Sequence, residues 1–236
     1  MPDGERRLRL LGLLVGHGPD IQTSRLCEVS AEATGMSGAG IMLMSEDVPR
    51  GSICTTDETS ARIEELQFTL GEGPSVDAYA QDRPVTEPHL ARTSRSRWLA
   101  FTPAALEVGA QAVFSFPLHV GAVRLGSLNL YCDRPGGLTD DQHADALVMA
   151  DVVAQAVLLL QANAPPGTLA EELESGGEFQ YVVHQASGMI AAQLDISIAR
   201  ALIRLRAYAF ANDRPLAEVA DEIVARTLRL DAPVGD

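Results

Sequence analysis

The sequence contains no lysine, so all 18 of its basic residues are arginines, and these face 32 aspartates and glutamates. The formal net charge is −14 at pH 7. A chain this acidic is soluble, and it does not adhere to nucleic acid or to an anionic membrane through charge spread over its whole surface. Any contact with an anionic partner has to come from a local group of arginines.

Long hydrophobic runs are also absent. The longest, such as residues 152–160, are much shorter than the roughly 20 residues that a membrane span needs. At the N-terminus, Leu8, Leu11 and Val15 recur at helical spacing, which is typical of a helix that docks on a domain rather than of a signal peptide. We therefore expect a cytoplasmic protein without membrane contact.

Signatures of metal, redox and phosphate chemistry are missing. The 3 cysteines have no CxxC spacing, which favours a reducing compartment over a disulfide framework. The 5 histidines show no metal-ligand spacing. The turn at residues 70–74, LGEGP, lacks the Lys-Ser/Thr of a phosphate-binding loop. The sequence thus predicts neither a metal site nor an enzyme.

The first two thirds of the chain predict an α+β fold. Two strand-like runs follow a helical segment, and two longer strands joined by a tight turn follow later, before a long helix at 140–161. Helices flanking an antiparallel sheet make an α+β domain. The expected strands cover residues 39–44, 51–55, 112–120 and 124–131.

The rest of the chain predicts a linker and a small helical module. Residues 162–177 combine Pro-Pro, Gly-Gly and acidic residues, which is typical of a linker. Three helices follow, at 178–194, 198–211 and 215–228. We expect this division: 1–19 N-terminal helical extension, 20–161 sensor domain, 162–177 linker, 178–232 three-helix module, and 233–236 tail.

Several motifs carry a resemblance to known families. LGEGPSVDAYAQDRPV (70–85), followed by the strand pair VFSFPL and GSLNLY, resembles a GAF domain. HQASGMI, ALIRLRAYAF and RPLAEVADEIV, beginning at residues 184, 201 and 214, resemble the ANTAR family of RNA-binding antitermination domains. The combination resembles an actinobacterial-type regulator. It implies a GAF domain that senses a signal and dimerises, and an ANTAR domain that binds stem-loops in nascent mRNA.

The first helix of the ANTAR-like module has no Asp, Glu, Lys or Arg from 179 to 194. Val183 and Ile190 belong to its core stripe, while Gln185 and Gly188 lie on a small, neutral opposite arc. Gly188 costs about 1 kcal/mol against alanine, so the face that keeps it predicts the close approach of another helix or of a nucleic acid. The pattern alone leaves both open.

The resemblance favours RNA for this face. It implies that Ala186 holds a structural position and that Gln185, Ser187 and Gly188 contact RNA. Ser187 stands where many family members have a basic residue, which removes one phosphate contact.

Arginines and an aromatic residue recur on the second helix of the module. Arg200, Arg204 and Tyr208 follow at i, i+4 and i+8, which offers phosphate contacts and a stacking plane to single-stranded RNA. The alternative is a solvated face whose arginines pair with acidic neighbours. Residues 178–236 hold six arginines against eight acidic residues. We therefore expect modest, salt-sensitive RNA affinity that needs two modules, as in a homodimer.

Three other positions match the family. Ala209 belongs to the buried stripe of the second helix. We expect Arg206 to be a half-buried structural residue paired with a carboxylate such as Asp221 or Glu222. Arg214 matches a basic family position near the third helix and is expected to contact phosphate.

The sensor domain has aromatic residues that could line a ligand pocket between sheet and helices. These are Phe68, Trp98, Phe101 and Phe116, and the alternative is that they form ordinary core. The cofactor is unknown, because the sequence has no heme, bilin-attachment, metal or cyclic-nucleotide motif. A small molecule or a protein is the expected input.

Other functional classes stay open on the residues alone. A three-helix module also fits a helix-turn-helix DNA-binding regulator, although its third helix, beginning PLAEV, offers few base-reading side chains. A non-enzymatic protein-interaction sensor would show no RNA affinity. One GAF-fold family reduces methionine sulfoxide through cysteines, but Cys27, Cys54 and Cys132 show no spacing of a nucleophilic and a resolving thiol.

Overall fold

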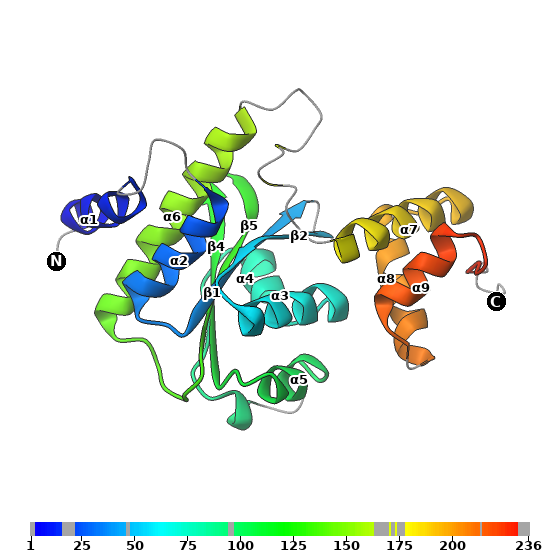
Figure 1. Cartoon of the computed structure of the whole chain (residues 1–236), viewed down its shortest axis with the longest axis horizontal. Coiled ribbons are helices and arrows are strands. Elements are labelled where there is room, and N and C mark those ends of the chain that lie inside the picture. Colours follow the sequence, from blue (N-terminus) through cyan, green and yellow to red (C-terminus); the bar gives the residue numbers. More distant parts are fainter. Residues whose placement is uncertain are drawn as a thin grey trace.

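A five-stranded antiparallel sheet in the order β2-β1-β5-β4-β3 forms the centre of the N-terminal domain (Figure 1). Its strands are β1 Gly38–Ser45, β2 Val48–Thr55, β3 Val85–Glu87, β4 Ala112–Val120 and β5 Val123–Cys132. The computed structural model describes residues 3–15, 22–45, 48–93, 97–162, 170, 173, 178–212 and 214–230. β1 pairs with β2, and β4 pairs with β5 across the turn at Gly121. Both predicted hairpins and the α+β fold class are confirmed.

Helices cover both faces of the sheet (Figure 1). α2 Thr23–Thr34 and α6 Asp140–Ala162 pack on one face, over Phe114, Phe116 and Leu128. The other face carries α3 Glu58–Leu70, α4 Pro74–Gln81, the 3-10 turn η1 Leu90–Arg92 and α5 Phe101–Glu107. Successive residues of a strand point to opposite faces, so β4 sends Phe114 and Phe116 to one side and Val113 and Ser115 to the other.

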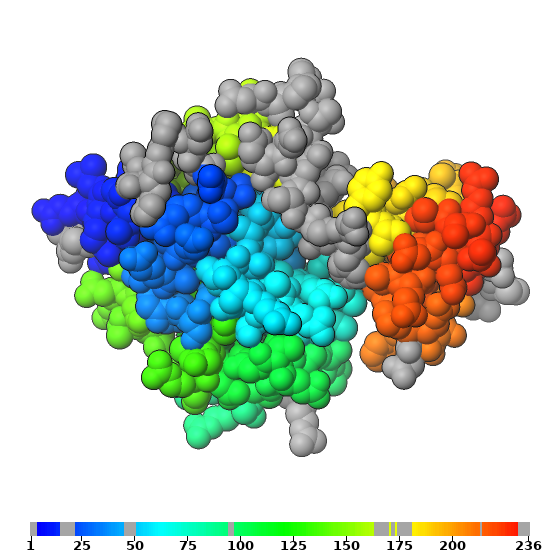
Figure 2. Space-filling view, in the orientation of Figure 1, coloured from blue at the N-terminus to red at the C-terminus, as the bar shows by residue number. Residues whose placement is uncertain are grey.

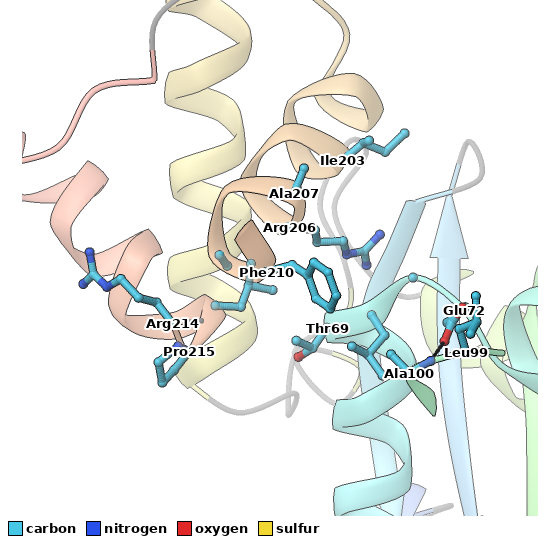
Figure 3. Close-up of a pocket in the computed structure, with 14 residues that line it drawn as sticks. Thr69, Glu72, Leu99, Ala100, Ile203, Arg206, Ala207, Phe210, Arg214 and Pro215 are labelled. Atoms are coloured by element: carbon cyan, nitrogen blue, oxygen red, sulfur yellow. Dashed lines mark hydrogen bonds between the residues drawn. The ribbon is translucent and has the colours of Figure 1, made fainter. Parts of the chain in front are cut away.

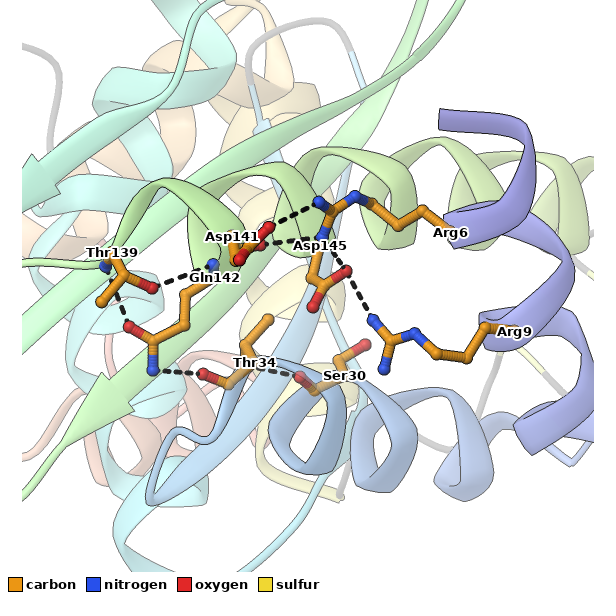
Figure 4. A network of polar contacts seen from close by, with 8 residues as sticks. All are labelled: Arg6, Arg9, Ser30, Thr34, Thr139, Asp141, Gln142 and Asp145. Carbon is orange, nitrogen blue, oxygen red and sulfur yellow. Dashed lines mark hydrogen bonds and ion pairs between the residues drawn. The ribbon is translucent and has the colours of Figure 1, made fainter. Parts of the chain in front are cut away.

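The N-terminal helix α1, Asp3–Val15, docks on α6 through a buried ion pair (Figure 4). Arg6 is buried and pairs with Asp145 at 2.5 Å and with Asp141 at 2.9 Å. This pairing raises the pKa of Arg6, and the arginine lowers the pKa of Asp141. Arg9 adds a second contact to Asp145 at 2.6 Å.

The docking face of α1 differs from the predicted one. Leu10 is buried beside Arg6, whereas Leu8, which we expected to dock, is 73% exposed. The predicted stripe is therefore wrong at Leu8, while Leu11 is half-buried and the side chain of Val15 lies outside the described residues. The carboxylates of α6 orient α1 by attracting Arg6, a preference that counting apolar residues does not capture.

Three helices form the C-terminal module: α7 Glu178–Leu194, α8 Ile198–Ala211 and α9 Leu216–Val224. Val183, Ile190, Leu202, Leu205 and Val219 meet in their common core. Ser197 caps α8 by accepting a hydrogen bond from the Arg200 amide at 3.3 Å. The predicted three-helix module is confirmed.

Most of the predicted linker, 162–177, and the tail, 233–236, lie outside the described residues. Ala170 and Leu173 of the linker are described, and both are buried against the core formed with α2 and α6. The Ala170 amide donates to Gln161 Oε1 at 3.1 Å. At these two positions the segment packs on the sensor domain, which the expectation of a segment without an apolar face did not anticipate.

Cys27 and Cys54 form a disulfide that joins α2 to β2, with their Cα atoms 6.1 Å apart. The sequence analysis favoured a reducing compartment over a disulfide framework and did not anticipate this bond. The two residues are 27 positions apart without any motif, and only the packing of α2 on the sheet brings them together. Cys132 is a free thiol.

Among the described residues one helix, α6, is long and apolar enough to cross a membrane, and α7 and α8 pass the same test together although they meet at 108°. Half of the apolar window of α6 is buried inside the protein, against the sheet. Core helices of soluble proteins have this character, so this is weak support for a span.

Candidate functional site

The helix α7, which carries no charged side chain after Glu178, has one buried and one open side. Val183, Ala186 and Ile190 are buried, as predicted. Ser187 is also fully buried, and its hydroxyl donates to the Val183 oxygen at 2.8 Å. The prediction that Ser187 contacts RNA is therefore wrong. The residue lies four positions after Val183 and three before Ile190, which places it within the core stripe.

The open side of α7 includes Gln185, which is exposed, and Gly188. A Cβ atom added to Gly188 would meet nothing within 4 Å. No helix of the chain therefore explains the glycine by packing against it, within the residues that are described. Because Gly188 has no side chain and no neighbour covers it, the α7 backbone is accessible to an external partner at this position.

The predicted polar side of α8 is largely accessible. Arg200 is exposed, and Arg204 and Tyr208 are half-buried. Tyr208 also packs against the core of the three-helix module. Ala209 is buried, in agreement with its expected place in the core stripe.

Arg214 is held by an ion pair within the module. Its guanidinium donates to both carboxylate oxygens of Glu222, at 2.8 and 3.0 Å. The pair raises the pKa of Arg214 and lowers the pKa of Glu222. A bidentate pair of this kind occupies the arginine geometrically. Arg214 therefore links the start of α9 to its last turn. This pairing gives no support to the predicted phosphate contact.

Arg206 points out of the three-helix module and reaches the N-terminal domain. Its Nη2 donates to the main-chain oxygen of Phe68 in the last turn of α3, and its guanidinium lies 5.7 Å from the centre of the Phe68 ring. The expected pairing with Asp221 or Glu222 is wrong. Burial lowers the pKa of Arg206 to about 10. No carboxylate among the described residues pairs with it.

The two domains share a hydrophobic cluster around this contact. Met42, Met44, Phe68 and Tyr79 of the N-terminal domain belong to the same buried cluster as the core of the three helices. The Phe68 ring meets His184 of α7 edge-on, with ring centres 5.6 Å apart. His184 is thus directed at the other domain.

Beside this contact lies a cavity of about 830 Å³ between the domains. Figure 2 shows the notch between the C-terminal helices and the rest of the protein. One wall is the end of α3 with residues 69–72 and 99–100, and the other is α8 with the start of α9. Figure 3 shows Phe210 and Arg206 reaching from α8 towards the first wall, while Arg214 points away.

The four aromatic residues that we expected to line a sensor pocket do not share a cavity. Phe116 faces α2 and α6, Trp98 and Phe101 belong to the cluster around α5, and Phe68 belongs to the interdomain cluster. All four are buried core residues, and none lines the cavity of about 830 Å³ or a smaller one of about 320 Å³ beside Arg206. The predicted pocket lining is wrong, because β4 directs Phe116 to the face opposite the other three.

A buried polar chain that the sequence did not reveal lies under α3. The Ser115 hydroxyl donates to Asn129 Oδ1 at 2.6 Å, and Asn129 Nδ2 donates to Glu64 Oε1 at 2.7 Å. Burial raises the pKa of Glu64 to about 8, although the hydrogen bond from Asn129 opposes the shift. Glu64 Oε2 has no hydrogen-bond partner in the described part of the chain. In the sequence, the only indication that Glu64 is buried was its position next to Ile63 on the inner side of α3.

The described residues contain no group of three His, Cys, Asp or Glu side chains that could hold a metal ion.

Family comparisons agree with this arrangement. A model of the GAF domain family matches residues 17–157, and one of the ANTAR domain family matches residues 171–224. The chain belongs to the GAF family and carries a C-terminal ANTAR domain. The resemblance to the GAF and ANTAR families noted in the sequence is confirmed. A GAF domain followed by an ANTAR domain is the composition of a signal-sensing transcription regulator with an RNA-binding, antitermination role.

Solved structures share the GAF fold at low sequence identity. The GAF domain from an Acinetobacter phosphoenolpyruvate-protein phosphotransferase is 11% identical, with a TM-score of 0.52, and the match covers 69% of this chain and 96% of that one. The corresponding domain from Coxiella burnetii is 12% identical, with a TM-score of 0.51, covering 68% and 95%. No curated protein matches the chain.

A type II free methionine-R-sulfoxide reductase from Thermoplasma acidophilum is also similar, with 15% identity, a TM-score of 0.46 and coverage of 65% of this chain and 93% of that one. This likeness concerns the fold and says nothing of activity here. GAF and ANTAR domains are typically regulatory and non-enzymatic.

Proposed function

We propose that this GAF–ANTAR chain is a signal-responsive transcription antiterminator that acts as a homodimer. Its ANTAR domain binds stem-loops in nascent mRNA and thereby prevents formation of the terminator. The observation that carries the proposal is the open face of α7 within a matched ANTAR domain, where Gly188 leaves the helix backbone bare.

The proposed RNA surface combines this bare face with the polar side of α8. Gln185 and Gly188 offer a neutral approach to unstacked bases, and Arg200 and Arg204 offer positive charge to phosphates. Tyr208 supplies a ring beside them. Ser187 and Arg214 are left out, since the first is buried and the second is paired with Glu222.

Dimerisation is proposed through the outer side of α6 and the adjacent α1. Leu147 and Leu159 of α6 and Leu8 of α1 are large apolar side chains that the monomer leaves exposed. A face of this kind is typical of helices that pack against a second copy. Two ANTAR domains per dimer would compensate for the small number of arginines in each one.

Specific binding can be tested by fluorescence anisotropy of the full chain with paired RNA hairpins and with matched duplex DNA, at low and moderate salt. Gly188→Leu is the decisive variant. An added Cβ meets nothing within 4 Å, and replacing a helical glycine favours folding, so we expect the variant to stay folded while its side chain blocks the bare face. We expect hairpin affinity to fall at least tenfold.

A control is Gly137→Leu in the segment before α6, where an added Cβ also meets nothing within 4 Å. It should bind hairpins like the wild type. Arg200→Ala combined with Arg204→Ala should weaken binding and flatten its salt dependence, since fewer counterions are released. Hairpin binding by Gly188→Leu equal to the wild type would reject the proposed face.

The helix-turn-helix alternative is disfavoured by α9. The helix buries Leu216, Val219 and Ile223, and its exposed positions include Glu218 and Asp221. Acidic side chains repel the phosphates that line a DNA groove. Binding to duplex DNA as tight as binding to hairpins would favour that alternative, and no binding to either would favour a protein-interaction sensor.

A further inference from the structure

The cavity between the GAF and ANTAR domains has the size and lining of a small-molecule site. Its volume of about 830 Å³ lies within the roughly 300–1,000 Å³ that is usual for ligand pockets. Such pockets occur preferentially where two domains meet, because each domain supplies one wall.

Apolar side chains gather in this cavity without covering one another. Leu99 is 73% exposed, Ile203 is 62% exposed and Phe210 is 78% exposed, and all three line it. Leu99 comes from the GAF domain and the other two from α8. Exposed apolar side chains that converge on one concave site mark a binding surface rather than ordinary scatter.

One positive charge in the lining is incompletely satisfied. Arg206 donates to the Phe68 oxygen through Nη2, but its buried Nε has no hydrogen-bond partner in the described residues. The other two charged residues of the lining are occupied, since Arg214 is paired with Glu222 and Glu72 accepts from the amides of Ala100 and Phe101 at 2.7 and 2.8 Å.

A second arginine, Arg124, adds positive charge close to Arg206. A second cavity of about 320 Å³ is lined by Arg206, Gly71 and Arg124. Arg124 donates to the Tyr79 oxygen and stacks on the Tyr79 ring, so it is held in place there. Two arginines from different domains thus face this second space. The low pKa of Arg206, about 10, reflects the cost of burying its charge, which an anion would offset.

We propose that the interdomain cavity binds a small organic anion: an apolar or aromatic body that carries one carboxylate, sulfonate or phosphate group. The anionic group lies against Arg206, and the body lies between Leu99, Ile203 and Phe210.

Binding there joins the two domains without covering the proposed RNA surface. At roughly 100° per residue, Ile203, Arg206 and Phe210 share one side of α8, whereas Arg200, Arg204 and Tyr208 share a neighbouring side. The ligand therefore acts on the orientation of the ANTAR domain relative to the GAF domain. The lining of the cavity does not include Glu64, Ser115 or Asn129, so the proposed ligand site is separate from that buried polar chain.

The test uses two fluorescent probes of similar shape on the full chain without RNA, so its outcome does not depend on the proposed function. Anilinonaphthalene sulfonate carries the anion, and N-phenylnaphthylamine is its neutral analogue. We expect one saturable sulfonate site per chain. Decanoate should displace the probe at least tenfold more effectively than decanol.

Variants assign the two halves of the ligand. Arg206→Met removes the charge and keeps an apolar side chain, so it should weaken the sulfonate probe about tenfold more than it weakens the neutral probe, which also reports any loosening of the two domains. Phe210→Ser should weaken both probes, and its exposed position leaves folding intact. Arg229→Met, an exposed arginine away from the cavity lining, is the control and should change neither. Equal affinity of the sulfonate probe for Arg206→Met, Phe210→Ser and the wild type would overturn the proposal.

Discussion

Arg206 of α8 donates a hydrogen bond to the main-chain oxygen of Phe68, in the last turn of α3, and thereby ties the ANTAR domain to the GAF domain. The carbonyl groups at the end of a helix lack partners within the helix and carry partial negative charge, so an arginine is well placed there. The Phe68 ring and His184 pack beside the same contact. This pair of residues therefore joins the two domains directly.

Replacing Arg206 by methionine should loosen the two domains from each other. The variant loses a charge-assisted hydrogen bond, which contributes about 1.5–3 kcal/mol in typical proteins. We expect faster amide hydrogen exchange in the last turn of α3 and in α8, with exchange in β4 and β5 unchanged. Arg229→Met is the control and should exchange like the wild type. Unchanged exchange in α3 would show that the contact does not hold the domains together.

Gly71→Ala should disturb the same contact from the GAF side. Gly71 has a φ of 66°, and an added Cβ would lie 2.6 Å from Arg206 Nη1. Gly121→Ala is a matched control, because its φ of 59° is similar and its added Cβ meets nothing within 4 Å. Backbone strain should cost each variant about 1–2 kcal/mol in the free energy of unfolding, and Gly71→Ala should cost more.

The excess should vanish when Gly71→Ala is made in an Arg206→Met background, since a flexible, uncharged side chain can move away. Urea denaturation of the four proteins of this double-mutant cycle measures the coupling. If the two substitutions change the free energy of unfolding additively, Arg206 moves away from the new methyl group without an energetic cost.

Glu64 should make the stability of the protein fall as the pH rises. Its pKa is raised from 4.5 to about 8 in the folded protein, so between these values the folded state holds a proton that the unfolded state releases. The free energy of unfolding therefore decreases through this window and is independent of Glu64 below it. The total is a few kcal/mol at most, since one pKa unit corresponds to about 1.4 kcal/mol.

Glu64→Gln removes the titration while it keeps the shape and the acceptor for Asn129. Relative to the wild type, the variant should gain stability from pH 5 to pH 8, as measured by urea midpoints across this range. Parallel pH profiles of the two proteins would show that Glu64 is ionised in the folded state.

The disulfide between Cys27 and Cys54 should make stability depend on the redox state. Cross-links that close loops of this length typically add about 2–4 kcal/mol. A reductant should therefore lower the urea midpoint of the wild type and of Cys132→Ala, but not that of the Cys27→Ala, Cys54→Ala double variant. If the wild type unfolds at the same midpoint with and without reductant, the bond contributes nothing to stability.

The sequence by itself determined the elements and the two families. Alternating strands, tight turns and helical periodicity depend on neighbouring residues, so the hairpins and the three C-terminal helices follow from local patterns. The motifs beginning at His184, Ala201 and Arg214 were sufficient to indicate an ANTAR domain, which the family comparison confirms.

Only the tertiary structure decided which sides of these elements meet. Arg206 was expected to pair within its own module, but the docking of α8 on α3 gave it Phe68 instead. The rotation of a helix about its axis changes by roughly 100° per residue, so a small error moved Ser187 from core to surface and Leu8 from surface to core in our expectations. The disulfide and the interdomain cavity join segments far apart in the chain, and no local pattern encodes such a distance.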